Sequence, residues 1–75
     1  MAMKPIVPGE TGKRVSAMQH ALVSHGYSVG AAGVDGKFGE HTTTALEAFQ
    51  DNAALPVRPL CDEANWIALG LPRED

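Results

Sequence analysis

The chain has 75 residues, which is enough for one domain but too few for a two-domain enzyme, a large substrate cavity or a sheet that encloses a cofactor. Its apolar fraction of 44% includes eleven alanines, so the larger apolar side chains can form only a small core. Six Lys and Arg against nine Asp and Glu give a net charge of −3 with no basic cluster. This balance argues against nucleic acid or a membrane surface as a partner.

Cysteine content and the N-terminal sequence indicate the cellular setting. Cys61 is the single cysteine and cannot form an internal disulfide. The first residues contain two prolines and no apolar stretch of signal-peptide length, and no run approaches the ~20 apolar residues that span a bilayer. We therefore expect synthesis in a cytoplasm without a signal peptide, and delivery by other means if the protein acts outside the cell.

The N-terminal quarter divides into an arm and a helix. Prolines and a glycine interrupt residues 1–11, which are predicted to form an extended arm. Residues 12–25 are predicted to form a helix, because apolar residues recur at helical spacing. Those on its inward face are Val15, Met18, Leu22 and Val23. Gly26 is the expected left-handed residue that ends this helix, and Tyr27 can then fold back onto it.

Residues 27–39 are rich in glycine and contain few side chains to bury, which predicts a long structured loop. Asp35-Gly36 favours a tight turn, because glycine accepts positive φ and aspartate can bond its own backbone. A very short hairpin around Val29 and Val34 is the one piece of regular structure expected there.

Two further helices follow. Residues 40–52 are predicted to be helical, with an inward face made of Ala45, Leu46, Phe49 and Ala53. A link with two prolines, residues 55–60, interrupts the helix. Asp62 is the expected N-cap of a short helix over 63–69, which Gly70 ends. Its inward residues are predicted to be Trp66, Ile67 and Leu69. Residues 12–70 thus form the domain and 71–75 a C-terminal tail.

An internal repeat accompanies this division. Residues 36–46 align with residues 59–69 at an offset of 23, and Glu, Ala and Leu coincide. Each copy is a turn that leads into a helix. The sequence therefore predicts an all-α fold, a small three-helix bundle with a Gly-rich structured loop and a degenerate turn–helix repeat.

Residue types needed for catalysis or metal binding do not come together in the sequence. Cys61 is followed by two acidic residues, which raise the pKa of a thiol. His20 and His25 diverge around their helix, and His41 is alone. A calcium loop centred on Asp35 lacks its oxygen ligands. We therefore expect no catalytic residue, no metal and no cofactor.

The glycine-rich loop and the second helix are predicted to form a recognition groove for a polar ligand with amide and sugar groups. Its candidate residues are Tyr27, Asp35, Lys37, Phe38 and His41. A purely structural explanation exists for part of this segment, since a tight turn that feeds a helix requires the same residues. They are Asp35, Gly36, Gly39 and Thr42.

Two runs of this sequence resemble the peptidoglycan-binding type 1 domain. They are Gly12-x-x-Val15-x-x-Met18-Gln19-x-x-Leu22-x-x-x-Gly26-Tyr27 and Asp35-Gly36-x-Phe38-Gly39-x-x-Thr42-x-x-Ala45-Leu46-x-x-Phe49-Gln50. The resemblance covers about residues 9–70 and implies a three-helix module that anchors cell-wall hydrolases, including phage endolysins, to peptidoglycan without being catalytic. Gln50 belongs to this pattern and joins the five groove residues as a sixth predicted ligand-binding residue.

The chain departs from the family pattern at three positions. Ala54-Leu55 stands where Gly-Leu is common, Pro59 where a glycine is common, and Asn65 where threonine is common. Asparagine can replace threonine as a hydrogen-bonding residue at a helix start, and proline can hold a turn. The departures therefore leave the fold in place and bear on a ligand site in the second turn.

An alternative function keeps this fold and changes the partner. The chain is then a phage virion or decoration protein that binds a capsid or tail protein by its helices and its N-terminal arm, with residues 5–8 ordering against the partner. The protein is accordingly expected to act either at the bacterial cell wall or in a virion. An inhibitory segment is disfavoured, because Cys61 lacks the Arg-Cys-Gly setting of that role.

Overall fold

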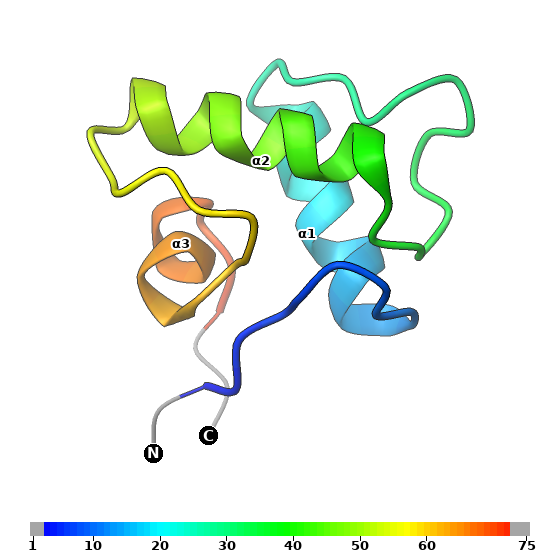
Figure 1. Ribbon diagram of the computed structural model, residues 1–75, viewed down its shortest axis with the longest axis horizontal. Helices are drawn as coiled ribbons and strands as arrows, with labels where there is room; N and C mark the ends of the chain where they lie inside the picture. Colours follow the sequence, from blue (N-terminus) through cyan, green and yellow to red (C-terminus); the bar gives the residue numbers. More distant parts are fainter. Residues whose placement is uncertain (1–2, 73–75) are drawn as a thin grey trace.

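Three helices make up the regular structure of residues 3–72, the part of the chain that the computed structural model describes. Their bounds are α1 (Lys13–Ser24), α2 (Glu40–Asn52) and α3 (Glu63–Ala68). In the view of Figure 1, α2 crosses in front of the C-terminal half of α1, and α3 lies beneath the C-terminal half of α2. None of the helices in this part of the chain is long and apolar enough to cross a membrane. The predicted all-α class with three helices is confirmed.

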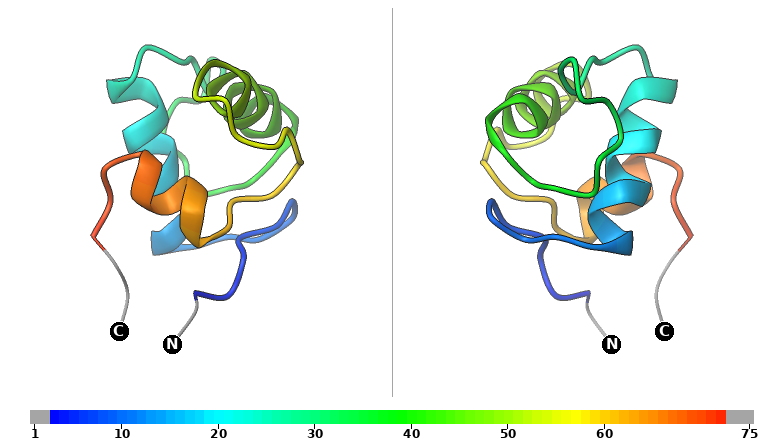
Figure 2. Two further views of the ribbon diagram at one scale, coloured as in Figure 1. Left: turned by 90° about the vertical axis from the view of Figure 1, so that its left-hand side faces the viewer. Right: turned by 90° about the vertical axis from the view of Figure 1, so that its right-hand side faces the viewer.

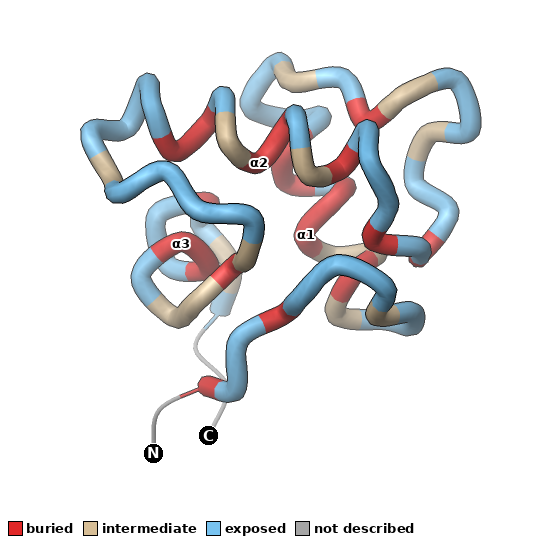
Figure 3. Tube along the Cα trace, in the orientation of Figure 1, coloured by how far each residue is buried: buried red, intermediate tan, exposed pale blue. Residues whose placement is uncertain are grey.

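The core is small and lies between the inner faces of the helices, as the buried segments in Figure 3 show. Val15, Met18 and Leu22 of α1 are 0% exposed, so the spacing identified these residues correctly. The larger core members from the other two helices and their ends are Leu46, Phe49, Trp66 and Leu69. Each such side chain stabilises the fold by ~1.5–3 kcal/mol when buried, so few can be lost.

Three residues predicted to point inward are exposed. Val23 and Ile67 are 47% and 44% exposed, and Ala53 is also at the surface. Val23 and Ile67 each follow a buried residue, Leu22 or Trp66, and one step along a helix turns the side chain by ~100°. Ala53 is the cap residue of α2 and lies past its last turn. Each predicted inward face therefore included one residue that is exposed in the structure.

The short hairpin expected around Val29 and Val34 does not form. Val29 is buried, but Val34 is 44% exposed. Between them, Gly30 and Gly33 have φ values of 93° and 68°, and the Gly33 N–H donates to the Gly30 carbonyl over 3.0 Å. Two positive φ values turn the backbone out of the extended conformation that a strand needs.

All three helices end in the same way. The closing backbone bonds of the Schellman type run from Tyr27 N to Leu22 O, from Leu55 N to Gln50 O and from Leu71 N to Trp66 O. The residues that turn the chain at these ends are Gly26, Ala54 and Gly70, with φ of 93°, 59° and 88°. Among the described residues, Ala54 is the only one with positive φ that is not glycine. Position 54, where the resemblance implies a glycine, thus has the positive φ that favours glycine.

The N-terminal arm is part of the domain's own core. Ile6 is 0% exposed and pairs in both directions with Cys61, each N–H donating to the other carbonyl over 2.9 Å. Further along the arm, the Phe38 N–H donates to the Glu10 carbonyl (3.0 Å) and the Gly9 N–H to the Phe38 carbonyl (2.8 Å). Figure 2 shows the arm along one side of the domain, beneath the link that leads into α3.

The predicted tail begins against α3, where the Trp66 indole N–H donates to the Pro72 carbonyl over 2.6 Å. Residues 73–75 of that tail and residues 1–2 of the arm lie outside the described residues. The predicted N-cap of α3 is confirmed. The Asn65 N–H donates to Asp62 Oδ1 over 3.0 Å, and Asn65 Oδ1 accepts from the Asp62 N–H, which completes a capping box.

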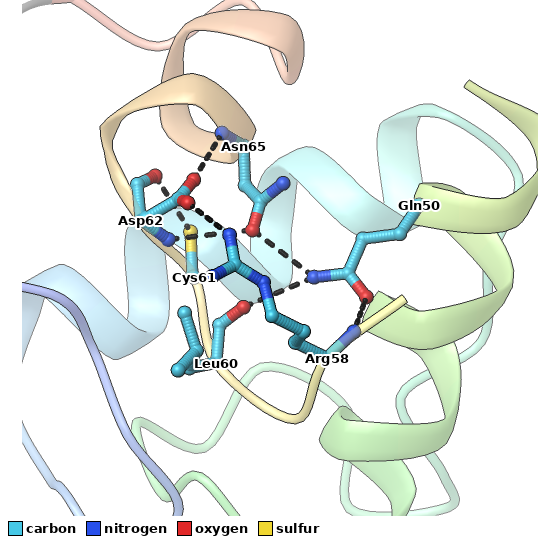
Figure 4. A network of polar contacts seen from close by, with 6 residues as sticks. All are labelled: Gln50, Arg58, Leu60, Cys61, Asp62 and Asn65. Carbon is cyan, nitrogen blue, oxygen red and sulfur yellow. Dashed lines mark hydrogen bonds and ion pairs between the residues drawn. The ribbon is translucent and has the colours of Figure 1, made fainter. Parts of the chain in front are cut away.

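A buried amide connects α2 to the turn before α3 (Figure 4). Gln50 is 0% exposed, and its Nε2 donates to the Leu60 carbonyl and to Asn65 Oδ1, both over 3.0 Å. Its Oε1 accepts from the Arg58 N–H over 2.9 Å. At the surface of this turn, the Arg58 guanidinium pairs with Asp62 over 2.6 Å. The polar atoms of Gln50 are thus fully used inside the domain.

Candidate functional site

The turn at residues 35–37 is built around a buried glutamine of α1. Gln19 is 0% exposed, and its Nε2 lies 2.9 Å from each of three acceptors, Asp35 Oδ1, the Lys37 carbonyl and Thr42 Oγ1. Its Oε1 accepts from the Gly36 N–H over 2.8 Å. One side chain therefore fixes both the turn and the start of α2, because a buried amide left without these partners would cost free energy.

Asp35 is held in its ionised form by the same turn. Its Oδ1 accepts from the Gln19 amide and also from the Lys37 N–H over 3.0 Å. These two hydrogen bonds, with the Gln19 bond as the larger cause, lower the pKa of the Asp35 carboxyl below its ordinary value. The turn thus presents a negative charge beside the positive charge of Lys37.

Gln19 and Gln50 make equivalent contacts in the two copies of the repeat. Each Nε2 donates to one backbone carbonyl and to one side-chain oxygen near the start of the next helix. The corresponding acceptors are Lys37 and Leu60 for the carbonyls, and Thr42 and Asn65 for the side chains. Both pairs are 23 positions apart, which is the offset of the sequence repeat.

The two copies differ at one backbone donor. The Gly36 N–H supplies the bond to the first glutamine, and its counterpart at the same offset is Pro59. Proline has no N–H, and the second glutamine instead accepts from the Arg58 N–H one position earlier. The departure from the family pattern at Pro59 is therefore accommodated without an orphaned acceptor.

Two hollows open on either flank of the 35–37 turn and share Asp35 and Lys37. The first, of about 650 Å³, is lined by Thr11, Gly12, Lys13, Ser16, Asp35, Gly36 and Lys37. The second, of about 250 Å³, is lined by Val29, Ala32, Asp35, Lys37, Gly39, Glu40, His41 and Thr42. We call the residues that line these two hollows the turn surface. The first hollow faces the start of α1 and the second faces the start of α2.

Three of the six predicted ligand-binding residues come together on the turn surface. Asp35, Lys37 and His41 line the second hollow, and all three are exposed. His41 also packs against the loop, since a Cβ added at Gly30 would lie 2.8 Å from the His41 ring. The predicted groove between the loop and α2 thus exists around these side chains.

Tyr27 lies in a different place. Its ring meets Phe49 edge-on with centroids 6.0 Å apart, and its hydroxyl accepts from Asn52 Nδ2 over 2.8 Å. It lines a small hollow of about 140 Å³ with His25, Phe49, Asn52 and Ala53. It also lines a hollow of about 410 Å³ in the glycine-rich loop, which shares Val29 with the second hollow of the turn surface. Tyr27 itself lines neither hollow of the turn surface.

Phe38 and Gln50, the other two predicted ligand-binding residues, are interior. Phe38 is 3% exposed and belongs to the core, and Gln50 is 0% exposed. Phe38 has its backbone paired with the arm, and Gln50 has its amide used by α3 and its turn. Neither side chain is therefore exposed on the turn surface.

The geometry can now be compared with known proteins. Residues 11–57 match the sequence model of a family described as "Putative peptidoglycan binding domain". The chain belongs to this family. The matched range contains α1, the 35–37 turn and α2, and therefore the whole of the turn surface.

Solved structures of other proteins share the fold. The N-terminal domain of SleB superimposes with a TM-score of 0.83 at 34% identity, over 89% of each chain. A peptidoglycan-binding protein from Clostridioides difficile, crystallised with glutamine hydroxamate, gives a TM-score of 0.83 at 37% identity. That match covers 89% of this chain and 40% of the larger protein.

One curated relative is similar over part of the domain. The type VI secretion system spike protein VgrG3 of Vibrio cholerae is 45% identical over 42 residues, which is 56% of this chain. The chain spans only 4% of the length of that protein. Domains of this family thus occur as small parts of larger proteins.

Sequence reasoning missed four residues of this peptidoglycan-binding domain. Thr11, Lys13 and Ser16 line the first hollow, and Gln19 holds the turn from beneath. The sequence feature that could have identified Gln19 is the similarity of its context to that of Gln50. Each glutamine follows a bulky apolar residue on a helix that precedes a turn. The three lining residues carried no such signal, because they precede the turn by about twenty positions and meet it only in the folded domain.

The described residues contain neither a metal-binding cluster nor an exposed thiol. Between residues 3 and 72, no group of three His, Cys, Asp or Glu side chains is placed to hold a metal ion. Cys61 is buried, and burial first, then the charge of Asp62, raises the pKa of its thiol to about 12. This thiol is therefore protonated and shielded at neutral pH, the opposite of an activated nucleophile.

Proposed function

We propose that this domain binds peptidoglycan through its turn surface and does not cleave it. The observation that carries the proposal is that the family match and the two hollows coincide on the same segment, residues 11–57. The buried Gln19 supports it, because a turn fixed by four hydrogen bonds loses little conformational freedom when a ligand binds.

A sedimentation experiment tests the proposal. The protein is mixed with purified, protein-free peptidoglycan sacculi, and the fraction that pellets is measured against an unrelated folded helical protein of similar size and charge. We expect the domain to pellet with the sacculi and the control protein to stay in solution. A domain that circular dichroism shows to be folded, yet that stays in solution, removes the wall-binding function.

The location of the site is tested with two histidines on different helices. His41 lines the second hollow, whereas His20 is exposed on α1 and lines neither hollow. We expect His41→Ala to weaken binding to sacculi and His20→Ala to leave it unchanged. Equal effects of the two substitutions would place the binding surface elsewhere.

The absence of cleavage is tested with the same material. We expect no release of soluble fragments from the sacculi on prolonged incubation, while an added wall hydrolase releases them. Release by the domain itself, abolished by a substitution on the turn surface, would show that it is an enzyme.

The alternative of a virion protein relied on the helices and on residues 5–8 as an arm that orders against a partner. Ile6 of this arm is 0% exposed and pairs with Cys61 in the domain's own core, whereas Pro5, Val7 and Pro8 are exposed. We therefore place peptidoglycan binding first and propose no second function.

A further inference from the structure

We propose that the first hollow, between Lys13 and Lys37, binds the free carboxylates of peptidoglycan stem peptides rather than the glycan strand. This inference rests on the proposed function and names the part of the polymer that the turn surface recognises. It follows from the charges of the hollow, from a comparison of the two repeat copies and from the absence of an aromatic face.

The positively charged side chains of the described residues differ in whether they form ion pairs. Arg14 and Arg58 each pair with a carboxylate four positions away, over 3.1 and 2.6 Å. Among residues 3–72, Lys13 and Lys37 form no ion pair, although the charge of Lys37 acts weakly on Asp35. Both lysines line the first hollow. Within the same range, Lys4 forms no ion pair either but does not line the hollow, so the first hollow is lined by two of the unpaired lysines together with the Asp35 carboxylate.

The repeat provides an internal control for what the fold itself needs. Gln19 has its structural counterpart in Gln50, 31 positions later, because both copies need the buried amide. At the offset of the turns, Lys37 corresponds to Leu60, so the second copy folds without a lysine at this position. The ammonium group of Lys37 is therefore not required by the turn–helix architecture.

Peptidoglycan has two chemically different parts, neutral N-acetylated sugar strands and short peptides that end in carboxylates. The apolar faces of sugars are best covered by exposed aromatic rings. None of the residues that line the first hollow is aromatic, and the nearby Phe38 is 3% exposed. Lysine ammonium groups instead form charge-assisted hydrogen bonds to carboxylates, and Asp35 supplies an acceptor for a peptide N–H.

The decisive experiment compares intact sacculi with sacculi whose carboxyl groups have been converted to amides. In intact sacculi the lactyl carboxyl of the sugar is tied up in the bond to the peptide, so the free carboxylates belong to the stem peptides. We expect amidation to weaken binding. Unspecific charge effects act in the other direction, because a protein of net charge −3 is repelled less by amidated sacculi.

A variant pair locates the effect in the hollow. We expect Lys13→Gln combined with Lys37→Gln to bind intact sacculi about three- to tenfold more weakly, because two exposed ion pairs contribute modestly. Lys4→Gln makes the matched change at an exposed lysine that does not line the hollow and is expected to bind normally. The double variant is also expected to bind amidated sacculi as well as the wild type does.

The outcomes separate the two levels of the proposal. Equal binding of the wild type to intact and amidated sacculi, or normal binding of the double lysine variant, overturns the carboxylate assignment and leaves wall binding in place. Failure of the folded wild type to bind either kind of sacculi overturns the proposed function itself.

Discussion

Gly36 faces Ser16 so closely that a Cβ at position 36 would lie 2.9 Å from the Ser16 hydroxyl oxygen. The same glycine has φ of 74°, a conformation that residues with a side chain rarely adopt. Two independent constraints, one on the backbone and one on space, therefore select glycine at the centre of the turn surface.

Gly36→Ala is expected to lower the free energy of unfolding by ~1–3 kcal/mol, as the sum of backbone strain and steric conflict. Gly33→Ala is the matched control, because φ at Gly33 is also positive, at 68°, but a Cβ there meets nothing within 4 Å. Gly33→Ala should lower the free energy of unfolding only by the cost of the backbone strain. Chemical denaturation measures both, and Ser16→Ala combined with Gly36→Ala should recover the difference. Equal costs for the two glycine variants would contradict the steric explanation.

Gln19→Leu is expected to destabilise the domain by ~2–4 kcal/mol, because it leaves the Gly36 N–H and the Lys37 carbonyl without their buried partner. Gln50→Leu should have a similar cost, because it makes the equivalent contacts in the second copy. His20→Leu, beside Gln19 but exposed, is the control and should change little. A Gln19 variant as stable as the control would mean that the buried amide is dispensable.

Ala54→Gly is expected to stabilise the domain, by up to about 1 kcal/mol, because Ala54 ends α2 with φ of 59°. Part of the gain is offset by the greater freedom of glycine in the unfolded chain. Thermal unfolding should show a rise in Tm of a few degrees, at ~4–8 °C per kcal/mol. Ala53→Gly, one position earlier with φ of −89°, should instead lower the Tm. A loss of stability in both variants would contradict the assignment of strain to Ala54.

The thiol of Cys61 gives the stability a dependence on alkaline pH. Burial raises its pKa from 9.0 to about 12, so the unfolded chain loses this proton before the folded domain does. The contribution to stability is fully present below pH 9.0 and is lost as the pH rises toward about 12.

Denaturation midpoints at neutral and alkaline pH test this dependence. Cys61→Ala is expected to be less stable at neutral pH, since it leaves a small cavity, but to lose less stability on the way to high pH. A thiol reagent should react slowly with the folded protein and fast with the unfolded one. Rapid reaction at neutral pH without unfolding would show that Cys61 is not shielded.

Periodicity and turn chemistry were sufficient to predict the helices. The predicted second helix, 40–52, matches α2 residue for residue, and the ends marked by Gly26 and Gly70 are correct. Propensity could not place Ile6, because nothing in a Pro-rich segment says that Ile6 fills the core against Cys61 while the neighbouring Val7 stays exposed. Whether such an arm is exposed or buried depends on contacts with residues that are distant in the sequence.

The candidate site was predicted less completely for a related reason. Asp35, Lys37 and His41 are close in sequence, and a turn that leads into a helix brings them together locally. Lys13 joins them only through the packing of α1 beneath the turn. Phe38 has a residue type common in binding sites, but a core this small buries both phenylalanines and the tryptophan of the chain. The charged residues of the candidate site were therefore predictable, whereas the burial of Phe38 was not.

The pairing of Ile6 with Cys61 sets a condition on how the domain folds. These residues come from opposite ends of the chain, and each donates a backbone hydrogen bond to the other. Contacts of such high sequence separation pay the full entropy of loop closure and form late. During synthesis Ile6 therefore cannot form this pair until Cys61 has left the ribosome, whereas Gly9 and Glu10 can already pair with Phe38.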